Sequence, residues 1–596
     1  MGESAAWQSG RPVCRRCDAG QTGRVALHDG CRSAYGLGVG ATRVRAGGWR
    51  ARAGAALAIA GAVLVGCTAP TPAPGPESPE LGGPTDPATV LAPDAPVPLA
   101  TATSAALYRT APVVVLAGAG DPDGQAGAAS AAVALGAPML VTPAADAEPR
   151  DTTAVTDEVR RLGPEALLAV GKTAQDWSTQ NGGGRKVVPA APAALTGVVK
   201  VGAGLARAVD ADGLTGAVAG LDRGRPELLT VPGATAPPEP VADGTPELPA
   251  STPTEPVRGL VVLARSGADQ VAAVATARAA GARVHVLPTP DPRSSGDLVT
   301  ELAAAPDEKV VALGGAFGPV ETLQQRLAVA RTGVQLPGGG QLAFPGRRMV
   351  ALYGTPGTPA LGSLGEQDVD GAIARVKDLA AQYQQHSDVP VVPAFEIITT
   401  VAAGQPGADG DFSNEVEIPK VRPYVDAAKA AGVYVVLDLQ PGRTDFLTQA
   451  KRYEELLVEP HVGLALDPEW RLQPGQVHRV QIGSVNVDEI NATGDWLAGL
   501  VRDRTLPQKL LLLHQFRTSM IVGRERLDTG HDELATMVHA DGFGTQQMKQ
   551  DTWNALRANA PNVYWGWKNF IDEDRPMLDP AQTLQVSGDI VFVSYQ

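Results

Sequence analysis

The sequence predicts an α/β protein in two parts. The N-terminal part is a flavodoxin-like or Rossmann-like region of parallel sheets in two divergent copies, and the C-terminal part is a (β/α)8 TIM barrel. Short apolar runs alternate with helical stretches along most of the chain, which is the pattern of parallel strands joined by crossover helices. Strand–helix units fill residues 347–596, and about 250 residues is the usual length of a (β/α)8 barrel.

The first 66 residues carry the pattern of a bacterial export signal. Arginines precede the apolar stretch 53–65, which is too short for a comfortable membrane span but suits the core of a signal peptide. The stretch ends in Leu64-Val65-Gly66-Cys67, which closely resembles the lipobox of bacterial lipoproteins. The resemblance implies that Cys67 is lipidated and holds the protein on the outer face of the cell membrane. A plain signal peptide or a short membrane anchor is the alternative.

Residues 1–40 stand ahead of this signal, although a signal peptide normally begins close to its basic residues. They contain Cys14-x-x-Cys17 and His28-x-x-Cys31, a spacing that can bind zinc. The other explanation is a start codon assigned too far upstream, which we favour. Beyond Cys67 the sequence has no cysteine, so the mature chain has no disulfide bond to stabilise it.

Pro-rich stretches with few large apolar residues divide the rest of the chain. Residues 67–104 are predicted to be a tether, residues 231–257 a linker, and a Gly-rich stretch from Leu336 to Gly346 precedes the barrel. The folded units are therefore expected at 105–230, 258–336 and 347–596. The abundance of Ala, Gly and Pro resembles the composition of actinobacterial proteins.

The units 105–230 and 258–336 look like divergent copies of one α/β unit. "PVVVLAGAGD" in the first and "GLVVLARSGAD" in the second each lead into an Ala-rich helix and a further strand. The pattern resembles the type 2 cell-wall-binding repeat of Gram-positive surface proteins, whose strand ends in Gly-Gly, as at Gly314-Gly315 here. Val170-Gly171-Lys172 stands at that place in the first copy, and the family's Asp-Arg-Tyr opening is missing from both. A generic flavodoxin-like pair is the alternative.

Two function classes are disfavoured by the sequence. The formal net charge is −14, and the mature part has no long basic run, so nucleic acid is not expected as a partner. Gly118 and Gly120 follow a strand, but the third glycine and the later acidic residue of a dinucleotide site are missing. No cofactor is therefore expected.

The barrel strands are predicted from apolar runs separated by helical stretches. The connection from Arg517 to Asp532 has too few apolar residues for a full helix. The predicted runs are 349–354, 389–398, 433–440, 462–467, 509–516, 534–541, 562–567 and 589–596.

Carboxylates follow several of these runs, and barrel active sites lie at the carboxyl ends of the strands. Gathered at one mouth, such groups push their pKa values apart and can supply the acid and the anion that glycosidic bond cleavage needs. Because side chains alternate along a strand, Asp467 and Glu469 are expected to share a face about 7 Å apart. The candidate catalytic residues are Glu396, Asp438, Asp467, Glu469 and Asp541.

"GLALDPEW" followed two strands later by "MVHADGFG" faintly resembles the chitinase-type glycoside hydrolases of family 18. The resemblance implies that Glu469 is the general acid, that Asp467 orients or stabilises the acetamido group of the substrate, and that Asp541 supports it. The sequence departs from that family, which has Asp at the positions of Val462 and Ala465 and an intact Tyr-Asp pair before the sixth loop.

Other polar and aromatic side chains near the strand ends are candidates for substrate binding, since aromatic faces commonly hold sugar rings. Each also has a structural explanation as a core filler, a helix cap or a turn residue. Neither His-x-His nor His-x-x-x-His occurs among them, so no metal site is predicted. The candidates are Trp470, Trp565, Trp567, Gln440, His514, His539, Tyr353 and Lys568.

The sequence therefore predicts a lipid-anchored, extracytoplasmic hydrolase that acts on cell-wall or extracellular glycan through carboxylates at the barrel mouth. The alternative is a surface lipoprotein whose barrel has lost its chemistry and only binds wall glycan. A weaker third hypothesis is metal-assisted hydrolysis of an ester or amide.

Overall fold

The structure is a computed structural model that describes residues 77–144, 146–201, 205–233, 247–252 and 254–596. The predicted signal, Cys67 and the Cys/His pairs near the N-terminus lie outside the described residues, as does much of the 231–257 linker. A search of the described helices finds none that is long and apolar enough to span a bilayer.

The first α/β unit contains a parallel sheet in the order β5 (Met139–Thr142), β4 (Val113–Gly118), β6 (Ala166–Val170) and β7 (Lys186–Ala190). Its helices are α2 (Pro122–Leu135), α3 (Pro149–Leu162) and α4 (Lys172–Asn181). Asp121 begins α2 by accepting a hydrogen bond from the amide of Gly124, and Gly136 ends it in the left-handed conformation. The predicted alternation of strands and helices is confirmed here.

The second unit repeats the order of the first three strands. Its sheet runs β11 (Arg283–Leu287), β10 (Leu260–Arg265), β12 (Lys309–Leu313) and β2 (Ala88–Leu91), all parallel. The helices are α7 (Val271–Ala279), α8 (Gly296–Ala304) and α9 (Val320–Ala330). The matching order supports the prediction of two copies of one unit.

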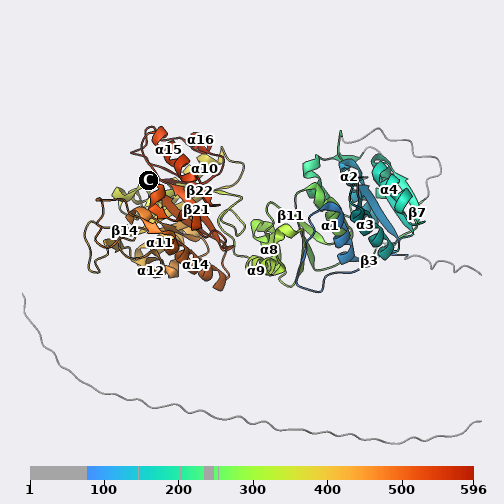
Figure 1. Ribbon diagram of the computed structural model, residues 1–596, viewed down its shortest axis with the longest axis horizontal. Helices are drawn as coiled ribbons and strands as arrows, with labels where there is room; N and C mark the ends of the chain where they lie inside the picture. The colour runs from blue at the N-terminus through green and yellow to red at the C-terminus, as the bar shows by residue number, and fades with distance from the viewer. Residues whose placement is uncertain (1–76, 145, 202–204, 234–246, 253) are drawn as a thin grey trace, which may run out of the picture. The chain divides into compact units, whose positions relative to one another are not determined.

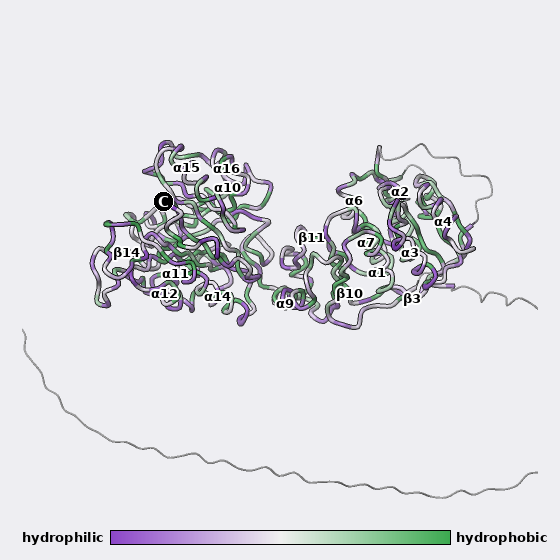
Figure 2. Tube along the Cα trace, in the orientation of Figure 1, coloured by the Kyte–Doolittle hydropathy of each residue, from purple (hydrophilic) through white to green (hydrophobic). Residues whose placement is uncertain are grey.

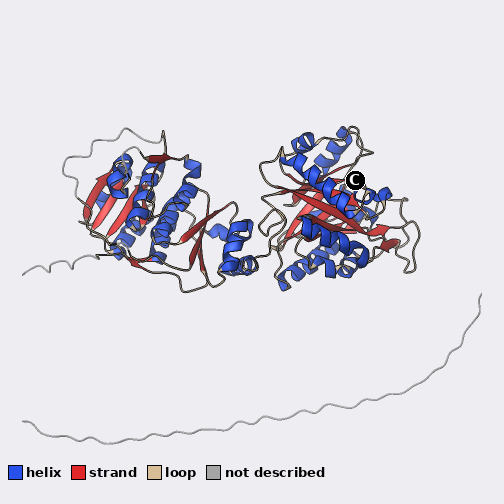
Figure 3. Cartoon of the chain, turned by 180° about the vertical axis from the view of Figure 1, so that it is seen from behind, coloured by secondary structure: helices blue, strands red, loops and turns tan. Residues whose placement is uncertain are grey.

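The fourth strand of that second sheet corrects the predicted tether. Residues 88–91 were assigned to the tether 67–104, but they pair with β12 as β2, and α1 (Pro96–Leu107) follows. The stretch Ala-Thr-Val-Leu is short and has Pro on both sides, which hides its strand character, yet its edge position needs only one neighbour. Helices α1 and α2 both pack against α7. Figure 2 shows hydrophobic residues along this part of the chain, and Figure 3 shows helices beside its strands.

The C-terminal unit, described without gaps over residues 347–596, is a closed barrel of eight parallel strands, as predicted. Strand β13 pairs with β14 on one side and with β23 on the other, which closes the barrel. A short strand, β15 (Ser413–Glu415), adds antiparallel to β14. The barrel strands are β13 (Arg348–Gly354), β14 (Val391–Ala402), β16 (Tyr434–Leu439), β17 (Val462–Leu466), β19 (Lys509–Gln515), β21 (Leu534–Ala540), β22 (Tyr564–Asn569) and β23 (Ile590–Tyr595).

Side chains of each barrel strand alternate between two apolar environments. Outward residues such as Leu437 and Leu513 pack against the surrounding helices, whereas inward residues such as Val436 and Leu512 fill the lower barrel. The helices lie around the strands (Figure 1). The main ones are α10 (Val369–Gln384), α11 (Ile418–Ala431), α14 (Val487–Asp503) and α15 (Gln546–Arg557).

The fifth connection has no α-helix within the described barrel, in line with its lack of apolar residues. It contains the short 3-10 turns η9 (Thr518–Met520) and η10 (Arg524–Arg526), with the two-residue strand β20 (Ile521–Val522) between them. Arg524 holds this connection by donating to Gln515 Oε1 at 2.9 Å and to the carbonyl of Leu556 at 2.7 Å.

The stretch from Leu336 to Gly346, predicted to be a linker, contributes to the barrel core. Leu336, Ala343 and Phe344 are buried in the same cluster as the inward residues of the lower barrel. The ring of Phe344 lies 5.3 Å from that of Tyr564 on β22. The stretch therefore closes the amino-terminal end of the barrel.

We expect Phe344→Ala to destabilise the barrel by about 3–5 kcal/mol, since it removes a fully buried aromatic ring and leaves a cavity. Calorimetric melting of the variant and the unchanged protein measures the loss. Val334→Ala, at a residue 40% exposed, is the control and should melt like the unchanged protein. Equal melting of the Phe344 variant would show that this stretch is a linker only.

Candidate active site

Polar residues form one complete layer inside the barrel, above the apolar filling. Seven strands of this fully described unit contribute one each, the eighth residue comes directly after β17, and none is more than 3% exposed. In strand order they are Tyr353, Glu396, Asp438, Asp467, His514, His539, Lys568 and Ser594.

Strand alternation explains why these residues share one layer. Glu396 lies two residues beyond Ala394, Asp438 two beyond Val436, and His514 two beyond Leu512, so each points inward like its apolar predecessor. The register agrees, because His514 pairs with His539 across β19 and β21. The sequence analysis named seven of the eight residues and missed Ser594, whose small side chain gives no signal in an apolar strand.

His514 is held between carboxylates on both ring nitrogens. Its Nε2 lies 2.8 Å from Glu396 Oε1 and 3.7 Å from Asp438 Oδ1, and its Nδ1 lies 3.0 Å from Asp541 Oδ2. The ring of His539 stands edge-on to it, with the ring centroids 5.2 Å apart. The structure thus brings together residues from four strands, as the sequence analysis expected of a carboxylate-lined mouth.

A second group of contacts surrounds Asp438. Tyr353 donates its hydroxyl proton to Asp438 Oδ2 at 2.9 Å, and Gln440 Nε2 donates to the Tyr353 hydroxyl at 3.2 Å. Lys568 Nζ lies 3.5 Å from the centre of the Tyr353 ring. These contacts fix Asp438 from the side opposite His514.

The prediction that Asp467 and Glu469 share one face of a strand is wrong. Strand β17 ends at Leu466, and residues 468–470 form the 3-10 turn η8 (Pro468–Trp470), because Pro468 cannot continue the strand hydrogen bonding. Asp467 accepts a hydrogen bond from the Glu469 amide at 3.4 Å. Asp467 is buried in the layer, and Glu469 is partly exposed above it.

Burial shifts the pKa values of these acids upward. Desolvation raises the pKa of Glu469 to about 7, and the charge of Asp541 adds to the shift. Desolvation and the charge of Glu469 raise the pKa of Asp467 well above its usual range. Desolvation raises the pKa of Asp438 to about 6, although the charge of His514 opposes it.

The pKa values of Asp541 and His539 shift downward, whereas that of His514 shifts upward. Burial would lower the pKa of His514, but the charge of Glu396 and the hydrogen bonds to Asp541 and Glu396 raise it well above its usual range. Burial favours protonation of Asp541, yet the His514 hydrogen bond and charge lower its pKa. Burial and the charge of His514 hold the pKa of His539 well below its usual range. The site thus combines protonated and ionised groups near neutral pH.

The aromatic residues at the rim differ in part from the prediction. Trp470 is partly exposed, with its ring 5.3 Å from that of His478. Phe543, which the sequence analysis missed, is 60% exposed two residues beyond Asp541, and its ring lies 5.6 Å from that of Phe570. These rings offer apolar surface beside the polar layer.

Trp565 and Trp567 are not at the mouth, and their predicted role in substrate binding is wrong. Both are buried against the ring of Trp553 on α15, at centroid distances of 5.4 and 5.7 Å. Their positions alternate with Gly566 and Lys568, which face inward, so both indole rings fill the space between β22 and the helices.

Groups that could hold a metal ion occur at three places in the described chain. In the polar layer, Glu396, His514 and His539 each place one ligand atom within 4.8 Å of the others, and all three are buried. The other two groups are more exposed: Asp495 on α14 with Asp528 and His531, and Asp409 and Asp411 with Glu415 on β15.

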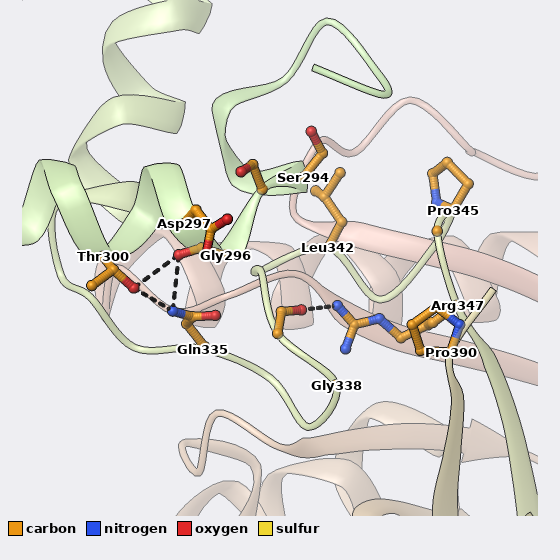
Figure 4. Close-up of a pocket in the computed structure, with 13 residues that line it drawn as sticks. Ser294, Gly296, Asp297, Thr300, Gln335, Gly338, Leu342, Pro345, Arg347 and Pro390 are labelled. Atoms are coloured by element: carbon orange, nitrogen blue, oxygen red, sulfur yellow. Dashed lines mark hydrogen bonds between the residues drawn. The ribbon is translucent and has the colours of Figure 1, made fainter. Parts of the chain in front are cut away.

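A pocket of about 430 Å³ lies apart from this layer, lined in part by the start of α8 and by residues 335–347 (Figure 4). Gln335 Nε2 donates to the Gly296 carbonyl at 3.1 Å and lies 3.0 Å from Thr300 Oγ1. Arg347 donates to the carbonyls of Pro337 and Gly339. These side chains hold the 335–347 segment in place, so we assign the pocket a structural role.

No family model and no curated protein matches the chain. Among solved structures, Cwp6 from Clostridium difficile is 11% identical, with 59% of this chain and 62% of that one covered and a TM-score of 0.32. A mutant of the cellobiohydrolase Cel6A from Humicola insolens is 11% identical, with 42% and 64% covered and a TM-score of 0.19. CcCel6C, a glycoside hydrolase family 6 enzyme from Coprinopsis cinerea, is 13% identical, with 51% and 82% covered and a TM-score of 0.20.

The chain spans about 62% of the length of Cwp6. These are distant structural similarities, and TM-scores this low transfer no site residue.

Proposed function

We propose that the barrel is a hydrolase acting on cell-wall or extracellular glycan, with Glu469 as the general acid. The observation that carries the proposal is the polar layer of the barrel, with the partly exposed Glu469 close enough to interact with the charges of His514 and Lys568. Glycosidic bond cleavage needs one protonated carboxyl and one carboxylate in different surroundings. Glu469 beside apolar and anionic neighbours, and Asp541 bonded to His514, provide such different surroundings.

The reaction we propose begins with a sugar ring bound beside Trp470 and Phe543. Glu469 donates its proton to the glycosidic oxygen as the bond from that oxygen to the ring carbon breaks, and a carboxylate of the layer stabilises the positive charge that develops on the ring. A water molecule then adds to the ring carbon and gives up its proton to a carboxylate of the site, and this proton restores the acid form of Glu469. Asp467 positions Glu469 by accepting a hydrogen bond from the backbone amide of Glu469. Tyr353, Gln440 and Lys568 hold Asp438 and can contact substrate hydroxyls.

A barrel that only binds glycan is the alternative. Burying several carboxylates is costly unless they have partners, and Asp438 Oδ1, Glu396 Oε2 and Asp541 Oδ1 have no hydrogen-bond partner. A binding surface gains nothing from such a cluster below the rim, whereas a catalytic site uses it. The energetic cost of burying these unpartnered carboxylates therefore favours a catalytic barrel over one that only binds glycan.

The assay that tests the proposal uses protein from residue 77 onward on fractionated cell-wall glycans and soluble polysaccharides. Release of new reducing ends is the expected result. Binding to a glycan without any release across the panel would replace the enzyme with the non-catalytic alternative. If reducing ends are still released after residues of the polar layer are replaced, the reaction takes place outside this layer.

The location outside the membrane is part of the proposal, on the strength of the lipobox-like segment. We expect Cys67→Ser to move most of the protein from the membrane fraction to the soluble fraction, since a lipid chain is the proposed anchor. Immunoblotting of the separated fractions measures this. Ser104→Ala, at a buried residue of α1 that bears no lipid, is the control and should stay with the membrane. Membrane retention of the Cys67 variant would contradict lipid anchoring.

A further inference from the structure

The buried group Glu396, His514 and His539 is built like a metal site. These residues come from three separate strands, and one ligand atom of each lies within 4.8 Å of the others. All three side chains are fully buried. Two imidazoles and one carboxylate are a common ligand set for divalent transition metals, with further positions left open for water or substrate.

Unpartnered polar atoms point independently to a missing ligand. His539 Nδ1 and Glu396 Oε2 are buried and have no hydrogen-bond partner, and the same is true of Asp438 Oδ1 beside them. Buried polar groups are nearly always satisfied, and each unsatisfied one costs roughly 1–3 kcal/mol. A metal ion bound among these residues would give such atoms a partner.

The surroundings of His514 match the outer partners of a metal-bound histidine. Asp541 Oδ2 lies 3.0 Å from His514 Nδ1, and the other ring nitrogen, Nε2, faces Glu396 and Asp438. A ligating histidine typically donates its second ring N–H to a carboxylate in this way, which fixes the ring. Asp541 is therefore a positioning residue for this ligand.

Charge balance favours a cation at the same place. Three carboxylates, Glu396, Asp438 and Asp541, lie within 4 Å of the ring nitrogens of His514. An ion between His514 and Glu396 would take the place of their hydrogen bond. The two facing atoms are 2.8 Å apart, and tetrahedral coordination at about 2.0–2.1 Å per bond needs them to separate by roughly half an ångström.

We propose that Glu396, His514 and His539 bind one divalent transition-metal ion of the Zn2+ class. Ca2+ and Mg2+ prefer oxygen ligands throughout, so a pair of imidazoles selects against them. The ion keeps Glu396 and His514 in place and leaves an open position facing the mouth. The proposal does not depend on the proposed glycan chemistry, because its grounds are the ligand geometry, the unpartnered atoms and the outer carboxylate of Asp541.

The test measures metal stoichiometry and affinity in the full-length chain after removal of bound metal and titration with Zn2+. We expect the unchanged chain to bind one more ion than His539→Gln or Glu396→Gln, and to melt at a higher temperature with Zn2+ than without. Asp541→Asn should keep the ion but weaken its affinity by about 10–100-fold, the usual effect of losing an outer partner. Mg2+ at the same concentration should not shift the melting temperature.

The control variant is His531→Gln, in the more exposed group with Asp495 and Asp528. It should bind Zn2+ as the unchanged chain does. The N-terminal Cys and His residues are common to all variants, so their zinc cancels in the difference. Equal Zn2+ binding by the unchanged chain, His539→Gln and Glu396→Gln, with circular dichroism showing all three folded, would overturn the proposal. The proposal would also be overturned if the unchanged chain bound no Zn2+ beyond the amount held by its N-terminal Cys and His residues.

Discussion

Glu469→Gln should lower turnover of a glycan substrate by roughly 10²-fold or more, the usual scale for loss of a general acid. Glutamine keeps the shape of the side chain but has no proton to donate to the leaving oxygen. Initial rates of reducing-end release from the two proteins measure the effect. Full activity in the variant would remove Glu469 from the mechanism.

Glu489→Gln is the matched control for this change. Glu489 is also a partly buried glutamate of the barrel, but it accepts from Arg471 at 2.9 Å on the side of α14 and does not face the polar layer. Its replacement should leave turnover within a few-fold of the unchanged protein. A loss equal to that of the Glu469 variant would mean that both act through stability.

The pH dependence of the same enzyme follows from the surroundings of Glu469. Burial and the charges of Asp541 and Asp438 favour its protonated form, and the charges of Lys568 and His514 oppose it. With its pKa raised to about 7, the acid is protonated below that pH, so kcat/KM should fall about tenfold per pH unit above it. The Gln variant should lack this alkaline limb.

The shift also predicts a stability effect. Because the pKa of Glu469 rises from 4.5 in its ordinary state to about 7 in the fold, the folded chain keeps a proton that the unfolded chain releases. The stability from that proton is present below about pH 4.5 and is lost as the pH rises through 7. The Gln variant avoids the buried charge, so at pH 8 it should melt above the unchanged protein.

The barrel and most of its polar layer could be predicted because strand ends and alternation are local properties of a sequence. Asp438 and His514 end apolar runs, and a polar residue there has few structural explanations. The same alternation separates Lys568 from Trp567, its neighbour on the strand. Strict use of this alternation predicts that both tryptophans of β22 face outward, toward the helices.

Other features were beyond prediction for physical reasons. The closeness of Glu396, His514 and His539 depends on barrel closure, because the three stand on different strands and no spacing along the chain connects them. Strand β2 is four residues long and gains its stability from a sheet formed far along the chain. Because the chain turns at Pro468, Glu469 does not continue the side-chain alternation of β17. Apolar patterning alone does not predict such a turn.

Lys568→Met should destabilise the barrel by about 3–5 kcal/mol, the scale of removing one partner from a buried ionic group. Lys568 is 3% exposed, and its charge lowers the pKa values of Asp438, Glu469 and Asp541. Methionine fills the same space without the charge, so the loss is electrostatic and not a cavity. Chemical denaturation of the two proteins measures it.

Activity provides a second readout that a merely structural role would not move. Without the Lys568 charge, the pKa of Glu469 rises further, so the alkaline limb of kcat/KM should move to higher pH. Lys429→Met, at a lysine with 59% of its side chain exposed, is the control and should change stability by less than about 0.5 kcal/mol with no shift of the limb. If the limb stays in place in the Lys568 variant while stability falls, then Lys568 supports the fold but does not set the proton affinity of the group that titrates in that limb.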